Sequence, residues 1–342
     1  MKKISLIYFL ALLVLSCQSE NTEKALIDDF SIDIPLVNDV NDLFGSPERI
    51  IQLDTIREAL IGRIGKIIKH ENHFYILSDE RRISHFDHEG KLVSSLDKRG
   101  GGPGEYTRIG DFNLFVINGN TELWICDTKE IRKYAPSGNS WDFTGTIDFD
   151  FVIHKFKIIS DKYILFVTGQ NEESLLLTDI TGAPLQKYLK SEFPFLHFYP
   201  VQFMNYDSCV IFKLGASNEG IALDTKDLSF KHIHIVKNNR FLTSKNLLDM
   251  YSRLGIDYLG ELSNSNNIRG FRNIKGIIWL NYTFQGENFV AARQQGVWKR
   301  IKYDRGNNAI MTSIIFSESS DSIILFEYPE DDTLNLILHE YQ

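Results

Sequence analysis

Six apolar runs of similar shape recur along the chain, and their spacing restricts its possible folds more than any other feature. Four of the five intervals between their centres are 40 to 49 residues long, and the remaining interval is 68. A four-stranded blade of a β-propeller needs a period of this length, whereas a helical repeat would place its apolar residues at helical spacing. The spacing therefore predicts an all-β fold, a six-bladed β-propeller of four-stranded antiparallel blades. The central residues of the runs are Ile76, Ile125, Leu165, Ile211, Trp279 and Leu325.

The first repeat unit also shows the order of strands within a blade. Strand-like segments cover residues 64–70, 73–78, 82–87 and 92–97, and the turn before the last segment contains Gly90. Glycine supplies the positive φ that tight hairpin turns require. The same order recurs in the next two units, which supports four strands in each blade.

The sixth unit ends too early to form a complete blade. Its last segment, "TLNLILHEYQ", is the third strand of the unit, so a fourth strand is lacking. An open ring would expose strand edges, which proteins generally cover. The segment Glu48–Thr55 has strand character and directly precedes the first unit. We therefore predict that this N-terminal strand closes the propeller, whose domain covers 48–342.

The N-terminus has the form of a bacterial secretion signal. Two lysines precede an apolar run of about a dozen residues, which is too short to span a bilayer as a helix. The sequence "VLSC" that follows resembles a lipobox, in which the cysteine is acylated. An ordinary signal peptide followed by a free cysteine is the alternative. We expect 1–16 to be the signal peptide, Cys17 the lipidation site and 17–47 a tether and N-terminal extension, so that truncation to about Asn38 is tolerated.

The first unit resembles a known family of propellers. Its segments "HFYILSD", "RISHFD" and "HEG", followed by "GGGPGEY", are similar to the NHL-like six-bladed β-propeller family of bacterial lipoproteins. The resemblance covers Glu48–Gln342 and is specific over Ile76–Tyr106. It implies the propeller fold and a location in the cell envelope, with lipid anchoring at the outer membrane, and it implies no particular reaction. The periplasmic or surface side is left open.

The residues Asp97–Tyr106, "DKRGGGPGEY", form the predicted crossover between the first two blades. Such crossovers run over the face where the inner strands begin, near the mouth of the central channel. Two interpretations stay open. The glycines and Pro103 shape the turn while Glu105 and Tyr106 tie it to neighbouring backbone, or this loop contacts a ligand. A phosphate cradle is disfavoured, because Glu105 follows the last glycine in place of the lysine of a P-loop.

Other side chains on the predicted crossover face extend this candidate site. Arg81 and Asp127 lie in turns after second strands, and His197 and Tyr199 lie in the aromatic crossover "EFPFLHFYP", where rings can stack against a sugar or a peptide side chain. Binding residues concentrate on loops that a rigid scaffold holds. The candidate ligand-binding residues are therefore Arg81, Arg99, Glu105, Tyr106, Asp127, His197 and Tyr199.

The 68-residue interval contains an insertion of about 238–267 on the same face. Thr243 or Ser244 is placed to cap a short helix with one apolar stripe. This helix either packs flat on the blades or forms a lid over the channel mouth.

Charge and composition restrict the possible partners. The net charge is −8 and no basic stripe is present, which argues against nucleic acid. Cys126 and Cys209 lie in apolar strands, as buried small hydrophobes do. His232 and His234 share one strand face, an arrangement compatible with metal ligands, but that strand is predicted at the outer edge of a blade. We expect neither a metal nor a cofactor.

Two classes of function remain. The first is a non-catalytic envelope module that binds a glycan, a peptide or a partner protein on its crossover face, because propellers offer a broad rigid rim and the chain lacks catalytic motifs. The second is a lyase or hydrolase with its site in the central funnel.

Overall fold

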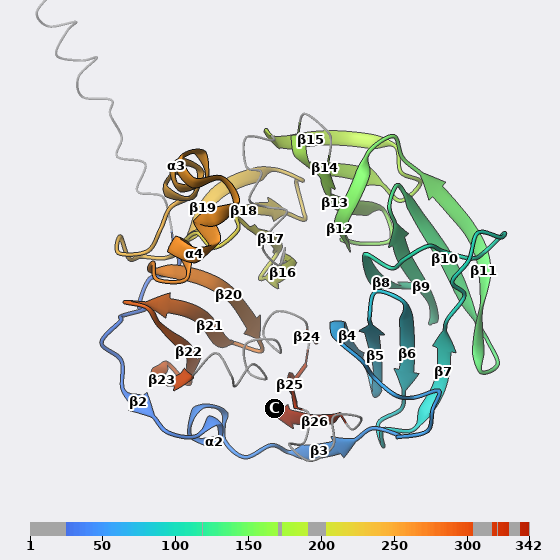
Figure 1. The fold of residues 1–342 in the computed structure, drawn as a ribbon, viewed down its shortest axis with the longest axis horizontal. Helices are drawn as coiled ribbons and strands as arrows, with labels where there is room; N and C mark the ends of the chain where they lie inside the picture. Colours follow the sequence, from blue (N-terminus) through green and yellow to red (C-terminus); the bar gives the residue numbers. More distant parts are fainter. Residues whose placement is uncertain are drawn as a thin grey trace, which may run out of the picture.

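Six small sheets form a ring around a central channel in the computed structural model, which confirms the predicted six-bladed β-propeller (Figure 1). We number the blades in chain order from the first complete repeat unit. The structure describes residues 25–117, 119–169, 173–190, 203–303, 317–319, 321–327 and 336–341.

Blades 1 to 3 each contain four antiparallel strands, ordered outward from the channel in chain order. Blade 1 consists of β4 (Ile64–His70), β5 (His73–Ser78), β6 (Arg82–Phe86) and β7 (Leu92–Leu96). Blade 2 consists of β8 (Asp111–Ile117), β9 (Asn120–Asp127), β10 (Glu130–Ser137) and β11 (Ser140–Asp148). Blade 3 consists of β12 (Val152–Ile158), β13 (Tyr163–Gly169), β14 (Glu173–Asp179) and β15 (Pro184–Lys190).

Blades 4 and 5 repeat this order and are joined by the insertion. Blade 4 consists of β16 (Phe203–Tyr206), β17 (Cys209–Lys213), β18 (Glu219–Asp224) and β19 (Phe230–Val236). Blade 5 consists of β20 (Asn267–Ile274), β21 (Ile277–Phe284), β22 (Glu287–Gln294) and β23 (Val297–Tyr303). The insertion contains α3 (Ser244–Leu254), the short 3₁₀ helix η2 (Gly255–Asp257) and α4 (Tyr258–Leu262).

Blade 6 is closed by the N-terminal strand, as predicted. Its sheet contains β25 (Ile323–Glu327), β26 (Ile337–Tyr341) and β3 (Arg49–Gln52). β3 pairs antiparallel with β26 and places Arg49 opposite Glu340. The short inner strand β24 (Ser317–Glu318) pairs in parallel with β4 of blade 1. The N-terminal strand β3 therefore completes blade 6, and β24 links blade 6 to blade 1 across the seam between these two blades.

Gly90 allows the closing strand to approach blade 1. Its φ is +85°, and a Cβ atom there would lie 2.3 Å from the carbonyl oxygen of Gln52. The backbone N–H of Asp54 donates to the carbonyl of Gly90 at 2.9 Å. A side chain at this turn would thus both strain the backbone and collide with β3.

The N-terminal strap, residues Ala25–Phe44, packs along the outside of the ring. β1 (Ala25–Ile27) pairs in parallel with β19, β2 (Leu36–Val37) pairs in parallel with β23, and α2 (Val40–Phe44) follows. Between the two strands, the ring of Phe30 packs edge-on against Tyr282 and Trp298 at centroid distances of 5.5 and 5.2 Å. The strap therefore belongs to the folded domain, and the expectation that truncation to about Asn38 is tolerated conflicts with this packing. The apolar strap residues Phe30, Ile32, Ile34, Leu43 and Phe44 are buried.

The two ends of the channel differ in what surrounds them. Each inner strand begins at the end where the connections between blades cross, which we call the crossover end. It finishes at the first hairpin turn of its blade, such as Glu71–Asn72 after β4, at what we call the hairpin end. The hydrophobic core lies between neighbouring blades rather than in the channel, because the apolar clusters combine residues from adjacent sheets. The inner strands therefore line the channel with charged and amide side chains beside apolar ones.

Candidate functional site

Tyr106, one of the predicted ligand contacts, is buried between blades 1 and 2. Its ring belongs to the apolar cluster that joins these blades and is 0% exposed. Its hydroxyl oxygen accepts from the backbone N–H of Lys98 at 3.0 Å, and the hydroxyl donates to the carbonyl of Arg81 at 2.7 Å. Tyr106 therefore anchors the glycine-rich loop and has no surface for a ligand.

Two other predicted residues also hold this loop. The Glu105 carboxylate accepts from the backbone N–H of Gly102 at 2.7 Å. The Asp127 carboxylate accepts from the backbone N–H and the hydroxyl of Thr107, at 2.8 and 2.6 Å. Asp127 is buried, whereas Glu105 is half-buried. The carboxylates that we assigned to a ligand thus satisfy donors of the loop itself.

Arg81 and Arg99 are the predicted residues of this loop region that are exposed. Arg81 lies in the β5–β6 turn and its guanidinium faces Asp97 at 3.7 Å. Arg99 is exposed and forms a backbone bridge with Tyr106. The expectation that the turns carrying Arg81 and Asp127 reach the face of the loop is confirmed by the bonds to Tyr106 and Thr107. His197, Tyr199 and Cys17 lie outside the described residues.

The insertion packs on the blades. Thr243 caps α3 in a capping box with Asn246, as the sequence suggested, and Leu247 and Met250 are buried against blade 4. Glu219 fixes the start of the helix, because its carboxylate accepts from the backbone N–H of Ser244 at 2.9 Å. In Figure 1, α3 and α4 lie toward the rim of the ring, away from its centre. This placement matches flat packing rather than a lid over the channel.

The channel holds a chain of charged side chains that we call the channel cluster. Lys66 Nζ lies 3.2 Å from a carboxylate oxygen of Asp111 and 3.3 Å from one of Glu318. Lys155 extends the chain beyond Asp111 at 3.6 Å, and Lys157 extends it beyond Glu318 at 3.1 Å. Lys155 and Lys157 are two positions apart on one strand and therefore share its channel face. The cluster consists of Lys66, Asp111, Lys155, Lys157, Arg272 and Glu318.

The cluster keeps its groups in their charged forms. Burial lowers the pKa of Lys66, but Asp111 and Glu318 more than offset this effect, so the pKa is raised. Burial likewise raises the pKa of Glu318, but Lys157, Lys66 and Arg272 outweigh it and hold the pKa well below its usual range. Neither group is therefore poised to exchange a proton near neutral pH.

A cavity of about 320 Å³ opens at the hairpin end of the channel. The cluster residues Lys157, Arg272 and Glu318 line it, while Lys66 and Asp111 lie deeper in the channel toward the crossover end. The Arg272 guanidinium is held in place by a bond of 3.0 Å from its Nη1 to the carbonyl of Phe203. The inner strand of each blade contributes to the wall through Lys69, Asn113, Lys157, Asn205, Arg272 and Glu318.

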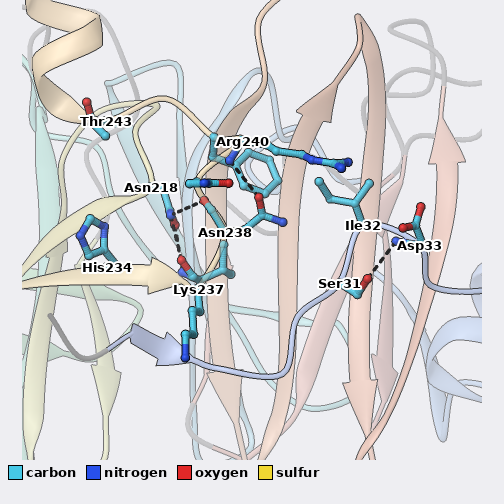
Figure 2. A pocket seen from close by; sticks show the side chains of 12 residues that line it. Ser31, Ile32, Asp33, Asn218, His234, Lys237, Asn238, Arg240 and Thr243 are labelled. Carbon is cyan, nitrogen blue, oxygen red and sulfur yellow. Dashed lines mark hydrogen bonds between the residues drawn. The ribbon is translucent and has the colours of Figure 1, made fainter. Parts of the chain in front are cut away.

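A second pocket of about 690 Å³ lies at the outer edge of blade 4, between the strap and the start of the insertion (Figure 2). Its polar groups largely serve the backbone. The Asn218 amide donates to the carbonyls of Val236 and Asn238 at 2.8 and 3.3 Å, and the Asn238 side chain accepts from the backbone N–H of Arg240 at 2.9 Å. This pocket is an open groove made where the strap meets a loop.

Chemical features expected of other sites are not found in the described part of the chain. No three His, Cys, Asp or Glu side chains come together there as a group able to hold a metal ion. Cys126 is a buried thiol, and burial raises its pKa to about 12. No described helix combines the length and apolar character that are needed to cross a membrane.

Comparison with known families matches most of the chain to one family. A domain of unknown function, DUF4934, matches residues 37–334. The chain belongs to the DUF4934 family. The matched region begins at the end of β2 and covers blades 1 to 5 and part of blade 6, ending just before β26. No curated protein matches the chain.

One solved structure shares the fold of this DUF4934 protein, and others are similar at lower scores. A "Putative exported protein" from Bacteroides fragilis NCTC 9343 is 14% identical, with a TM-score of 0.66 over 86% of this chain and 94% of that one. The Cps50 (Swd1) β-propeller domain from Myceliophteria thermophila is 8% identical, with a TM-score of 0.47 over 86% and 100%. A protein of unknown function from Bacteroides caccae is 8% identical, with a TM-score of 0.45 over 80% and 96%. At 14% identity the similarity to the exported protein concerns the fold alone.

Sequence reasoning missed the channel cluster. Its members come from inner strands of four blades and from β24, and each strand by itself shows only the ordinary alternation of apolar and polar residues. A usable signal was the recurrence of cationic residues on inner strands, with Lys66 in "IGKIIKH", Lys155 and Lys157 in "VIHKFKI" and Arg272 in "NIRGFRNI". Such a recurrence points to one channel wall only once the propeller is accepted.

Proposed function

We propose that this protein is a lipid-anchored, non-catalytic binding module of the bacterial cell envelope, which takes its ligand into the channel cavity at the hairpin end. The observation that carries the proposal is a polar cavity of about 320 Å³ walled by the inner strands of the ring. Ligand sites are concave and have a few fixed polar groups, and strands hold such groups more precisely than loops do.

The arrangement of polar groups favours this cavity over the crossover face. On the crossover face, Glu105, Tyr106 and Asp127 satisfy the glycine-rich loop. In the cavity, Asn205 and Asn273 line the open space from two blades, and Asn205 is exposed. A ligand that enters the hairpin end meets polar side chains without displacing the bonds that hold the loops.

A non-catalytic role is supported by the electrostatics of the channel. General acid–base catalysis works best with a group whose pKa lies near the operating pH. The pKa of Lys66 is raised and that of Glu318 is lowered, which moves both away from neutrality. The cluster is suited to holding fixed charges.

The envelope location is supported by the lipobox-like "VLSC" and by the likeness to a protein named as exported. In a bacterial host that processes lipoproteins, a clickable palmitate analogue should label the wild-type chain. Cys17→Ala should lose the label and leave the membrane fraction, and Cys209→Ala should keep both. Unchanged membrane association of Cys17→Ala would exclude this anchor.

The binding site is tested by filling the cavity. A panel of sugars, sugar acids and dipeptides is measured by thermal shift on the wild type, Asn205→Trp and Asn239→Trp. Asn205 lines the channel cavity and Asn239 lines the outer pocket, and both are exposed. We expect Asn205→Trp to abolish the shift that a bound compound causes and Asn239→Trp to retain it. The reverse result places the site in the outer pocket and refutes the proposal.

A further inference from the structure

The channel cluster carries more positive than negative charge, although the whole chain is acidic. It combines four cationic side chains, Lys66, Lys155, Lys157 and Arg272, with two carboxylates, Asp111 and Glu318. The net charge of the chain is −8. A positive site inside an acidic protein is costly to build without a counter-charge, because like charges repel strongly where water is scarce.

The two carboxylates are already shared between cations. Asp111 faces both Lys66 and Lys155, and its second oxygen accepts from the backbone N–H of Phe156 at 3.2 Å. Glu318 faces both Lys66 and Lys157. Each carboxylate therefore pairs with two ammonium groups, and the positive charge of the cluster is left only partly balanced. A further negatively charged group would be favoured here.

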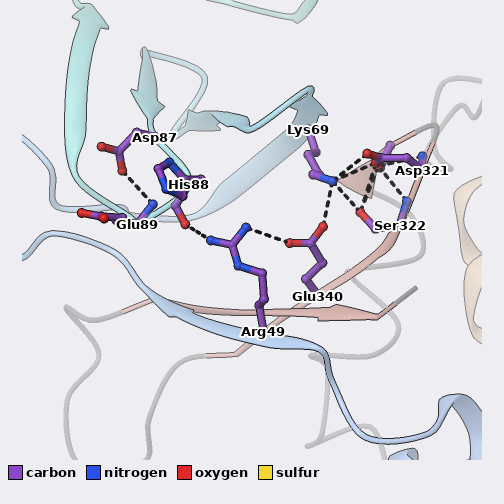
Figure 3. A network of polar contacts seen from close by, with 9 residues as sticks. Arg49, Lys69, Asp87, His88, Glu89, Asp321, Ser322 and Glu340 are labelled. Carbon is purple, nitrogen blue, oxygen red and sulfur yellow. Dashed lines mark hydrogen bonds and ion pairs between the residues drawn. The ribbon is translucent and has the colours of Figure 1, made fainter.

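This excess of positive charge reaches the cavity wall. Lys157 and Arg272 line the cavity from blades 3 and 5, and Glu318 is the carboxylate of the cluster that lines it with them. Lys69 also lines the cavity but is neutralised, because its Nζ lies 2.9 Å from Asp321 and 2.7 Å from Glu340 (Figure 3). Lys157 and Arg272 are thus the cations placed to meet a ligand.

We infer that the ligand of the channel cavity carries an oxyanion, a carboxylate or a phosphate group, which binds between Lys157 and Arg272. This inference rests on the proposed binding function. An arginine presents a planar fork of donors that matches the oxygens of either group, and a lysine adds a point charge. The negative charge of the bound anion adds to that of Asp111 and Glu318 and offsets the remaining positive charge of the cluster.

The test removes charges of opposite sign from the two partners of one ion pair at the cavity wall, Lys157 and Glu318. Lys157→Gln removes a positive charge, whereas Glu318→Gln removes a negative charge and keeps an oxygen that can accept a hydrogen bond. Lys162→Gln is the matched control, because Lys162 is exposed in the β12–β13 turn of the same blade. Citrate, inorganic phosphate and glucose serve as the probes, and binding is measured by calorimetry at about 50 and about 200 mM NaCl.

We expect citrate or phosphate to bind and glucose not to bind. Lys157→Gln should raise the Kd of the bound anion about tenfold, as the loss of one charge-assisted hydrogen bond does. Glu318→Gln should lower this Kd, and Lys162→Gln should leave it unchanged. Higher salt should weaken binding in every variant. Comparison of citrate with phosphate decides between the two oxyanions.

Opposite outcomes separate this inference from the binding function. If glucose binds, Asn205→Trp abolishes its binding and Lys157→Gln does not change it, the channel site stands and the anionic class is wrong. If Lys157→Gln and Glu318→Gln weaken anion binding equally, the cluster is only structural and the inference fails. Binding of either anion that Asn205→Trp leaves intact overturns both. Circular dichroism of each variant verifies that the propeller is folded.

Discussion

Lys69 and Glu340 form an ion pair of 2.7 Å across the seam where blade 1 meets blade 6 (Figure 3). Both side chains are buried, and a second oxygen of Glu340 lies 3.7 Å from Arg49 on the closing strand. Arg49 also donates to the carbonyl of His88 in blade 1. One carboxylate thus joins the first blade, the last blade and the strand that closes the ring.

Glu340→Gln should destabilise the protein by about 3 kcal/mol, because breaking a buried ion pair leaves its partners uncompensated. The free energy of unfolding is measured in urea. Glu287→Gln is the control, since its pair with Lys302 is half exposed and should contribute less than about 1 kcal/mol. Equal losses of unfolding free energy in the two variants would show that the buried ion pair at the seam stabilises the protein no more than the exposed pair does.

Removing the anchor of the N-terminal strap should cost stability. Phe30→Ala should lower the free energy of unfolding by about 3 to 4 kcal/mol, because the ring is buried against Tyr282 and Trp298. Leu36→Ala, in the same strap, changes a side chain that is 55% exposed and should cost less than about 0.5 kcal/mol. If Phe30→Ala left the free energy of unfolding in urea unchanged, the strap would not contribute to the stability of the domain.

The glycine-rich loop should depend on the Tyr106 hydroxyl rather than on its exposed arginine. Tyr106→Phe leaves the N–H of Lys98 without its hydroxyl acceptor and should cost about 1 to 3 kcal/mol. Arg99→Ala should leave the melting temperature unchanged, because that side chain is exposed. A loss of stability in Arg99→Ala alone contradicts the placement of these two residues.

Glu219 should make stability depend on pH in the acid range. Burial raises its pKa, but the contacts of its carboxylate with His232 and Ser244 outweigh burial and lower the pKa from 4.5 to about 2. The resulting stability is present above about pH 5 and is lost as the pH falls toward 2; it amounts to roughly 3 kcal/mol. The stability difference between wild type and Glu219→Gln should therefore shrink from pH 5 to pH 3. A constant difference across this range in thermal unfolding would be inconsistent with the lowered pKa.

The blades could be predicted because their information is local. β5 is a continuous apolar run of the kind found in buried strands, and the turn at Gly90 marks the hairpin between β6 and β7. Closure by β3 followed from the missing strand of the last unit. The strap was missed although Phe30, Ile32 and Ile34 alternate with polar residues, because the polar stretch before them suggested a continuing tether.

The site was harder to predict because its contacts link distant parts of the chain. The burial of Tyr106 depends on how blades 1 and 2 pack together, which the loop sequence does not contain. Lys66, Asp111 and Glu318 meet only after the ring has closed. A residue type suited to binding, such as the Asp127 carboxylate, is equally suited to bonding a backbone N–H, and only the structure separates these roles.

Closure by β3 also ties the order of synthesis to the completion of the fold. Arg49 leaves the ribosome before any blade has been made, whereas its partner Glu340 leaves after all of them. β3 must wait without a partner while the rest of the ring assembles, and such long-range pairing is slow. A chain that ends before β26 therefore leaves β25 and β3 without the strand that pairs with both. The pairing of β3 with β26 can therefore form only after the last strand of the propeller has been synthesised.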